Sequence, residues 1–196
     1  MSELNLWLIR HGECTTNTGV WTNSPGSSPL TVKGKEQAKQ TAEQIVLRPE
    51  LVIVSPLLRA QESAEPILER WPNVPVETWA IEEFTYLSPS KLKNISREER
   101  LRMIGEYWER SDPNYRDGDD AESFTSFMHR LLNFHERLHT KPGFLVAVGH
   151  GQFFRAYQLG LKQGFTATVA WMHKFRNKET SNPLANSEIL KLEGKW

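Results

Sequence analysis

The chain has 196 residues, and 24 lysines and arginines balance 24 aspartates and glutamates, so the formal net charge is zero. This length predicts a single domain with a sizeable hydrophobic core. The balanced charge argues against a nucleic-acid partner or a membrane-surface partner, because proteins of both classes need an excess of cations. No apolar stretch approaches the roughly 20 residues that cross a bilayer. One cysteine cannot form an internal disulfide, and the N-terminal segment does not resemble a secretory signal, so we expect a cytoplasmic protein.

Short apolar runs alternate along the chain with segments of helical pattern. The run at 4–9 predicts the first strand, and the continuous runs Leu51–Val54 and Phe144–Gly149 are typical of strands that are buried on both faces of a parallel sheet. Residues 74–79 form a further candidate strand. A late edge strand is expected at 187–192.

Two helices in the first half of the chain carry start signals. Thr31 is expected to cap a helix that runs through Ile45. Ser55 is expected to cap a second helix that begins with Pro56, because proline is favoured at the first helical position. This second helix is expected to last to about Trp71, where a Trp-Pro-Asn sequence ends it.

The alternation of buried strands and helices predicts an α/β fold, specifically a three-layer α/β/α sandwich with a mostly parallel sheet and an edge strand. The charged stretch at 88–119 interrupts the alternation and is expected to form a small helical cap inserted beside the sheet. Further helices are expected from about residue 120 and directly after residue 149. We find no linker, so the whole of 1–196 is predicted to be one domain.

Residues of types that can bind phosphate follow directly after the buried strands. Arg10 and His11 follow the first strand, Arg59 follows the second, and His150 follows the strand that ends at Gly149. Ligands of open α/β sheets bind beyond the carboxyl ends of the strands, so we expect these four side chains to meet. Two guanidiniums can hold phosphate oxygens in pairs, a neutral imidazole can attack phosphorus, and a second imidazole, if protonated, can donate to the oxygens where charge collects in the transition state.

A phosphoryl-transfer site of this kind also needs a carboxylic acid, because the leaving alkoxide must receive a proton. Glu82 and Glu83 follow the candidate strand at 74–79, and both are placed to supply that proton. The residues alone leave the choice between them open.

Several blocks of sequence, in a fixed order, resemble the signature of the histidine phosphatase (phosphoglycerate-mutase-like) superfamily. The blocks are Arg10-His11-Gly12-Glu13 with Asn17, then 29–38, 55–64, 83–86, Glu122-Ser123 and 148–151. Mutases of this family carry a longer insertion with two adjacent arginines, whereas the cap segment here offers Arg97, Arg100 and Arg102, none of them adjacent. The resemblance is therefore to the phosphatase branch of the family.

This resemblance implies a role for each matching residue. His11 becomes the phosphorylated nucleophile, and Glu83 becomes the acid that protonates the leaving group and then activates water. The phosphate pocket is formed by Arg10, Arg59 and His150, with further donors from Asn17 and from the backbone near Gly151 and Gln152. The family reading predicts a metal-independent, cofactor-independent phosphomonoester hydrolase that acts on a small phosphorylated metabolite.

Two other functions fit the same residues. One is a phosphotransferase of phosphoglycerate mutase type, and the other is a non-catalytic scaffold that binds phosphate. A separate motif, His135-Glu136-Arg137-Leu138-His139, matches the HExxH pattern of zinc proteases. At 100° per residue, however, His135 falls within the apolar stripe of its helix, so we interpret the motif as part of a packing surface.

Overall fold

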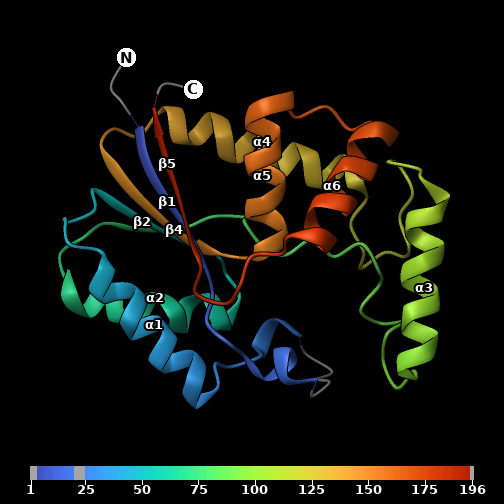
Figure 1. Cartoon of the computed structure of the whole chain (residues 1–196), viewed down its shortest axis with the longest axis horizontal. Helices are drawn as coiled ribbons and strands as arrows, with labels where there is room; N and C mark the ends of the chain where they lie inside the picture. The colour runs from blue at the N-terminus through green and yellow to red at the C-terminus, as the bar shows by residue number, and fades with distance from the viewer. Residues whose placement is uncertain (1–3, 20–24, 195–196) are drawn as a thin grey trace.

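The computed structural model describes residues 4–19 and 25–194 (Figure 1). Five strands form one sheet in the order β3-β2-β4-β1-β5. Their bounds are Leu4–Arg10 for β1, Leu51–Val54 for β2, Val76–Thr78 for β3, Phe144–Gly149 for β4 and Ile189–Gly194 for β5. Strands β1 to β4 are parallel, whereas β5 pairs antiparallel with β1. The predicted mostly parallel sheet with an edge strand is confirmed.

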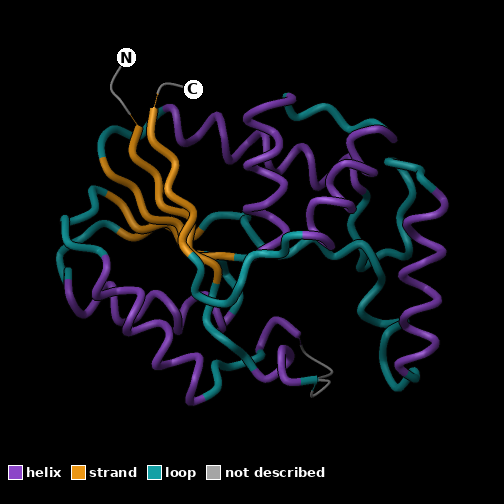
Figure 2. Tube along the Cα trace, viewed as in Figure 1, coloured by secondary structure: helices purple, strands orange, loops and turns teal. Residues whose placement is uncertain are grey.

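Helices cover both faces of the sheet and make three layers, as predicted (Figures 1 and 2). One layer holds α1 (Val32–Gln44) and α2 (Leu58–Arg70), and the other holds α4 (Phe124–His139), α5 (Gly151–Gln163) and α6 (Val169–Ser181). Successive residues of a strand point to opposite faces. Accordingly, Val146 and Val148 of β4 pack in the hydrophobic cluster of α1 and α2, while Leu145 and Ala147 pack in that of α4, α5 and α6.

The predicted start of the second helix is wrong. Helix α2 begins at Leu58, with Leu57 at the N-cap position and no capping side chain. The Oγ of Ser55 lies 2.8 Å from Nε2 of His150, and it accepts a 3.4 Å hydrogen bond from the amide of Leu57, the residue before the helix. Thr31, by contrast, caps α1 as predicted, and its Oγ1 accepts a hydrogen bond from the Gly34 amide.

Other boundaries moved by a few residues. Helix α4 begins at Phe124 rather than near residue 120, because Ser123 is its N-cap and its Oγ accepts from the Ser126 amide. Helix α6 was not predicted. Two short 3₁₀ helices, η1 (Thr15–Thr18) and η2 (Pro25–Ser27), lie between β1 and α1.

The segment at 88–119 contains one helix within the described residues, α3 (Arg97–Arg110), capped by Ser96. This helix stands beside the body of the molecule and belongs to neither helical layer (Figure 1). Aromatic side chains join it to the body: Tyr107 of α3 packs 4.8 Å from Tyr86 between ring centroids. Across the two described ranges, we find no helix with the length and apolar character that a membrane-spanning segment requires.

Candidate active site

Side chains from the ends of β1 and β4 and from the first turn of α2 meet in one cluster. The Nε of Arg59 donates a hydrogen bond to Nε2 of His11 at 3.1 Å. Its Nη2 lies 3.3 Å from Nδ1 of His150. The centroids of the two imidazole rings are 5.1 Å apart. One guanidinium therefore touches both imidazoles, within the reach of a single phosphoryl group.

His11 is held as a neutral base with one nitrogen ready to react. Its Nδ1 lies 2.7 Å from the Gly12 carbonyl oxygen, which can only accept, so the ring proton is on Nδ1 and the lone pair is on Nε2. The side chain is 2% exposed. Burial, followed by the charges of Arg59 and Arg10, lowers the pKa of His11 to about 3. The imidazole is consequently uncharged, as a nucleophile must be.

His150 is fully buried, and both of its ring nitrogens are occupied. Ser55 lies 2.8 Å from Nε2, and Arg59 faces Nδ1. Burial holds the pKa of His150 well below its usual value, and the neighbouring charge of Arg59 adds to this effect. Because a guanidinium only donates, the neutral ring accepts at Nδ1 and donates from Nε2 to the Ser55 hydroxyl.

Arg10 is the last residue of β1, and one of its side-chain N–H donors is unused. Its Nη1 donates to the Leu184 carbonyl, while its buried Nε has no hydrogen-bond partner among the described residues. A buried unpaired donor is costly, and a phosphate oxygen is a suitable acceptor for it. Gly151 leaves room for this arginine, because a Cβ at position 151 would lie 3.3 Å from Cδ of Arg10.

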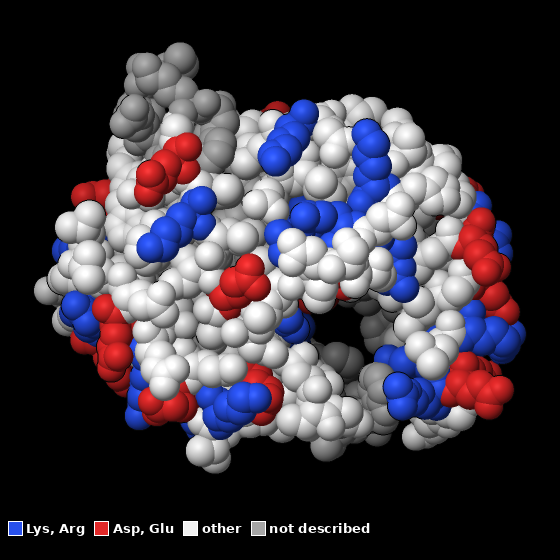
Figure 3. Space-filling model, in the orientation of Figure 1, with Lys and Arg blue, Asp and Glu red and all other residues white. Residues whose placement is uncertain are grey.

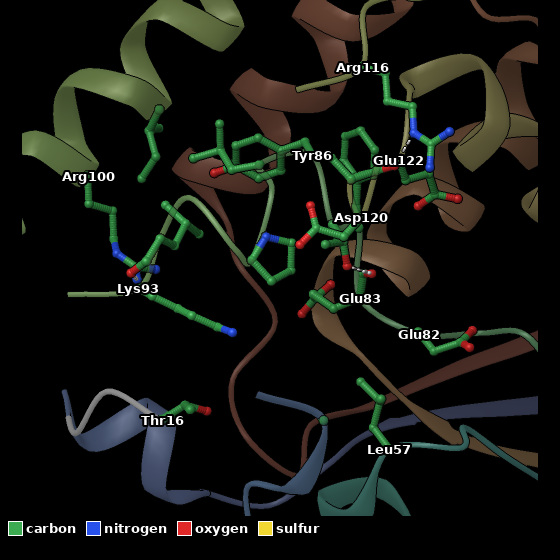
Figure 4. A pocket seen from close by; sticks show the side chains of 18 of the residues that line it. Thr16, Leu57, Glu82, Glu83, Tyr86, Lys93, Arg100, Arg116, Asp120 and Glu122 are labelled. Atoms are coloured by element: carbon green, nitrogen blue, oxygen red, sulfur yellow. Dashed lines mark hydrogen bonds between the residues drawn. The ribbon is translucent and has the colours of Figure 1, made fainter. Parts of the chain in front are cut away.

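Glu83 meets the requirements of the acid more closely than Glu82. Its Oε1 accepts a hydrogen bond from the Gln152 amide at 2.9 Å, which leaves Oε2 to carry a proton. Burial raises the pKa of Glu83 even though Arg10, Arg59 and the Gln152 amide favour its charged form. Glu82 is turned away from it (Figure 4), toward Arg130, and its Oε2 lies 3.5 Å from Nη1 of that arginine.

Asn17 and the Gln152 amide, which were predicted to donate to phosphate, form hydrogen bonds within the protein instead. Asn17 lies in η1 and is exposed, and its Oδ1 accepts from the Cys14 amide and from Nδ2 of Asn186, both at 3.1 Å. Asn186 also donates to the His11 carbonyl at 3.2 Å, so Asn17 belongs to the hydrogen-bond network around the loop that carries His11. The Gln152 amide is used by Glu83, as described above.

Sequence reasoning missed two buried serines in this network. One is Ser55, which was interpreted as a helix cap. The other is Ser63, whose Oγ donates to the Arg59 carbonyl at 2.6 Å and accepts from the Gly12 amide at 3.0 Å. Ser63 thus connects the loop after His11 to the first turn of α2, which carries Arg59. Its spacing of four residues after Arg59, which places both on one helix face, was the available signal.

Two glycines allow the loop after β1 to approach α1 closely. A Cβ at Gly12 would lie 2.4 Å from the Gly34 carbonyl oxygen, and a Cβ at Gly34 would lie 1.9 Å from the Glu13 carbonyl oxygen. Real side chains do not tolerate such distances. The close approach gives a physical reason for glycine at both positions.

A cavity of about 1340 Å³ adjoins this cluster (Figure 4). Arg59 and Glu83 line it on the side of the sheet, and Lys93 and Arg100 line it on the side of the cap. Aromatic Tyr86 contributes to the wall between them. Figure 3 shows the molecule hollowed between the lobe that carries α3 and the body. A phosphoryl group at Arg59 can therefore carry a large substituent.

The HExxH motif lies elsewhere, on α4. The Nε2 atoms of His135 and His139 are 3.1 Å apart, and Nδ1 of His135 lies 3.1 Å from the Tyr157 hydroxyl. Over residues 4–19 and 25–194, no group of three or more His, Cys, Asp or Glu side chains is arranged to hold a metal ion. The half-buried ring of His135 packs against Phe165, in keeping with a packing surface.

Comparison with known proteins was made on both sequence and structure. The family model described as "Histidine phosphatase superfamily (branch 1)" matches residues 6–182. A curated relative from Enterobacter sp. (strain 638), named "Probable phosphoglycerate mutase GpmB", is 39% identical over 67 residues. That match spans 34% of this chain and 31% of the relative, so it covers about a third of each protein.

Solved structures resemble the whole chain. A mycobacterial glucosyl-3-phosphoglycerate phosphatase has a TM-score of 0.69 and 22% identity, covering 99% of this chain and 92% of that one. The α-ribazole phosphatase of Shigella flexneri has a TM-score of 0.70 and 22% identity, covering 95% and 89%. At these identities the likeness establishes a shared fold.

Proposed function

Since the chain belongs to the histidine phosphatase superfamily, we propose that it hydrolyses phosphomonoesters through a phosphohistidine intermediate at His11. The observation that carries this proposal is the position of Arg59, in hydrogen-bond contact with two buried imidazoles and beside a carboxyl group whose pKa is raised. A site that only bound phosphate would have no use for a neutral nucleophile and a protonated acid.

In the first step, phosphoryl oxygens take over the hydrogen bonds that Arg59 makes to the imidazoles and also receive the unused donor of Arg10. The Nε2 lone pair of His11 is then free to attack phosphorus. The proton stays on Nδ1 and keeps its hydrogen bond to the Gly12 carbonyl oxygen, which stabilises the positive charge that develops on the ring. Glu83 gives its proton to the departing alkoxide.

In the second step the same groups act in reverse. The Glu83 carboxylate, now ionised, takes a proton from a water molecule that attacks the phosphohistidine. The Nε2–phosphorus bond breaks, the electron pair returns to His11, and inorganic phosphate leaves. Both steps use only side chains of this chain, and we propose that no metal or cofactor takes part.

We propose a phosphorylated metabolite with a sizeable alcohol part as the substrate. A cavity of about 1340 Å³ is larger than a small phosphorylated acid needs, since pockets for drug-sized ligands measure about 300–1,000 Å³. The names of the similar structures, glucosyl-3-phosphoglycerate phosphatase and α-ribazole phosphatase, also describe phosphatases of conjugated substrates. Of the three cap arginines, Arg100 lines the cavity, whereas exposed Arg102 pairs with Glu106. This arrangement favours hydrolysis over a mutase reaction.

The test is the release of inorganic phosphate from a panel of phosphomonoesters, with and without EDTA. We expect multiple-turnover release that EDTA does not change. Transfer of the phosphoryl group to a second hydroxyl, without net release, would replace the hydrolase with a mutase. Binding without turnover of any ester, p-nitrophenyl phosphate included, would leave only the scaffold.

A further inference from the structure

We propose that Arg130, on α4, is a positioning residue that holds Glu83 beside Arg59 and holds the carboxylate of Glu82, which lines the same cavity, turned away from Glu83. This proposal rests on the proposed function, in which Glu83 is the acid. The problem that Arg130 solves is local. Residues 81–86, which include both glutamates, form no helix or strand. The backbone of this segment therefore has no regular hydrogen-bond pattern of its own that would fix the direction of the Glu83 side chain.

Arg130 anchors the segment just before the acid. Its Nη1 donates to the Ala80 carbonyl at 3.0 Å and to the Glu82 carbonyl at 3.1 Å. The same nitrogen lies 3.5 Å from the Glu82 carboxylate. Nη1 of Arg130 thus donates to the backbone on the N-terminal side of Glu83 and also pairs with the carboxylate of Glu82. The carboxylates of Glu82 and Glu83 point in different directions (Figure 4), so an anchor on the backbone and carboxylate of Glu82 also fixes the direction of Glu83.

The other edge of the guanidinium is fixed by Glu122. Nε of Arg130 lies 2.7 Å from one carboxylate oxygen of Glu122, and Nη2 lies 2.8 Å from the other, which is the two-point geometry that fixes a guanidinium in its plane. The Glu122 amide in turn donates to the Thr85 carbonyl at 2.8 Å. The pair of Arg130 and Glu122 therefore contacts the chain on both sides of Glu83.

Arg130 is well suited to this task. Its side chain is 20% exposed, and its guanidinium lies over the rings of Phe127 and Phe153 at 5.4 and 5.3 Å from the centroids. A lysine would keep the charge but would lose the planar fork that reaches two carbonyls and a carboxylate together. Arg130→Lys therefore separates positioning from charge.

The same helix supplies a matched control. Arg137 lies two turns further along α4, pairs with Glu77 at 3.0 Å and covers Trp79, and none of its hydrogen bonds or ion pairs in the described structure is to Glu82 or Glu83. Arg137→Lys removes a comparable fork from the same helix without touching the acid. Its effects report the general cost of altering an arginine on α4.

The experiment compares kcat/KM for two substrates, because this ratio reports the steps up to phosphorylation of His11. Glycerol phosphate has a poor leaving group that needs the acid, whereas p-nitrophenyl phosphate has a good one that does not. We expect Arg130→Lys to lower kcat/KM for glycerol phosphate by about tenfold to a hundredfold, against about threefold or less for p-nitrophenyl phosphate. Arg137→Lys should alter neither by more than about threefold. Inhibition by inorganic phosphate, which reports the phosphate pocket, should be unchanged in both variants.

Equal losses on the two substrates, or no loss on either, would overturn the positioning role. If Arg130→Lys does not fold, Glu122→Gln provides the second test, since it removes the two-point pair but leaves Arg130 in place, and the same selective loss is expected. Glu83→Gln serves as the reference. A selective loss in Glu83→Gln without one in Arg130→Lys refutes this inference alone, whereas the absence of a selective loss in Glu83→Gln refutes the acid role as well.

Discussion

The buried imidazole of His11 should make the stability of the protein sensitive to acid, and a single substitution at this position should relieve that sensitivity. An unfolded chain exposes His11 to water, where its pKa is 6.5, whereas in the folded protein the pKa is about 3. Between these values the unfolded state binds a proton that the folded state cannot. The folded state therefore loses stability as the pH falls from about 6.5 toward 3, because a proton bound only by the unfolded state favours unfolding.

The size of this effect follows from the shift. Each pH unit below 6.5 costs about 1.4 kcal/mol while the folded imidazole stays neutral, so His11 costs about 2.5 kcal/mol between pH 7 and pH 4.5. Glutamine keeps the polar character of the side chain but cannot take up a proton. When the pH falls from 7 to 4.5, the free energy of unfolding should therefore decrease by about 2.5 kcal/mol less in His11→Gln than in the unaltered protein.

The assay is urea unfolding at pH 7 and pH 4.5, in which only the difference between the two pH values is compared. Any contact that His11→Gln loses at both pH values cancels from that difference. The control is His129→Gln, which makes the same replacement at an exposed histidine on α4, outside the cluster of His11, Arg59 and His150. An equal loss of stability in His11→Gln and the unaltered protein would refute the neutral, buried state assigned to His11.

Three further predictions concern the acid and the glycines. Glu83→Gln should lower kcat/KM for alkyl phosphates by about 10²- to 10⁴-fold but barely affect p-nitrophenyl phosphate, and loss on both alike would count against an acid role. Glu83 must be protonated to act as the acid, so kcat/KM for an alkyl phosphate should fall as the pH rises through the raised pKa of Glu83. The pH profile for p-nitrophenyl phosphate should lack this fall, and identical profiles for the two esters would contradict the prediction. Gly34→Ala places a Cβ against the Glu13 carbonyl and should lower the free energy of unfolding, measured in urea, by about 3 kcal/mol. Gly151→Ala crowds Arg10 and should raise KM with little change in stability. A larger loss of stability in Gly151→Ala than in Gly34→Ala would contradict the packing described.

The fold was largely predictable because the central strands are apolar on both faces. Val52 and Val54 of β2 face one helical layer and Ile53 faces the other, so β2 appears in the sequence as an unbroken apolar run with clear ends. Strand β3 is an edge strand, and only 76–78 of the expected 74–79 pair with β2. Because β3 is exposed at the edge of the sheet, the apolar pattern of the sequence does not show where its pairing with β2 begins and ends.

Helix α6 shows where the pattern failed. Only Trp171, Met172 and Phe175 are buried along its thirteen residues, so the apolar stripe is too narrow to stand out among the charged side chains. The start of α2 failed for a different reason. Ser55 has the residue type of a helix cap, but a buried His150 competes for its hydroxyl, and only the folded structure reveals that competition.

The candidate site was predictable to the extent that strand ends determine it. Arg10, His11 and His150 follow directly from the sheet, because the carboxyl ends of parallel strands share one edge. Arg130 could not be predicted in the same way. It reaches residues 80–82 from a helix some fifty positions later, and no local pattern encodes that contact.

The most direct measurement is the chemical identity of the trapped intermediate. Rapid acid-free quenching during turnover of a 32P-labelled ester, followed by peptide mapping, should find a base-stable, acid-labile phosphoryl group on His11. With p-nitrophenyl phosphate as the ester, whose leaving group needs no acid, more of it should accumulate in Glu83→Gln, where water is not activated, and none should form in His11→Gln. A covalent phosphoryl group on any other residue, or full turnover by His11→Gln, would contradict nucleophilic attack by this imidazole.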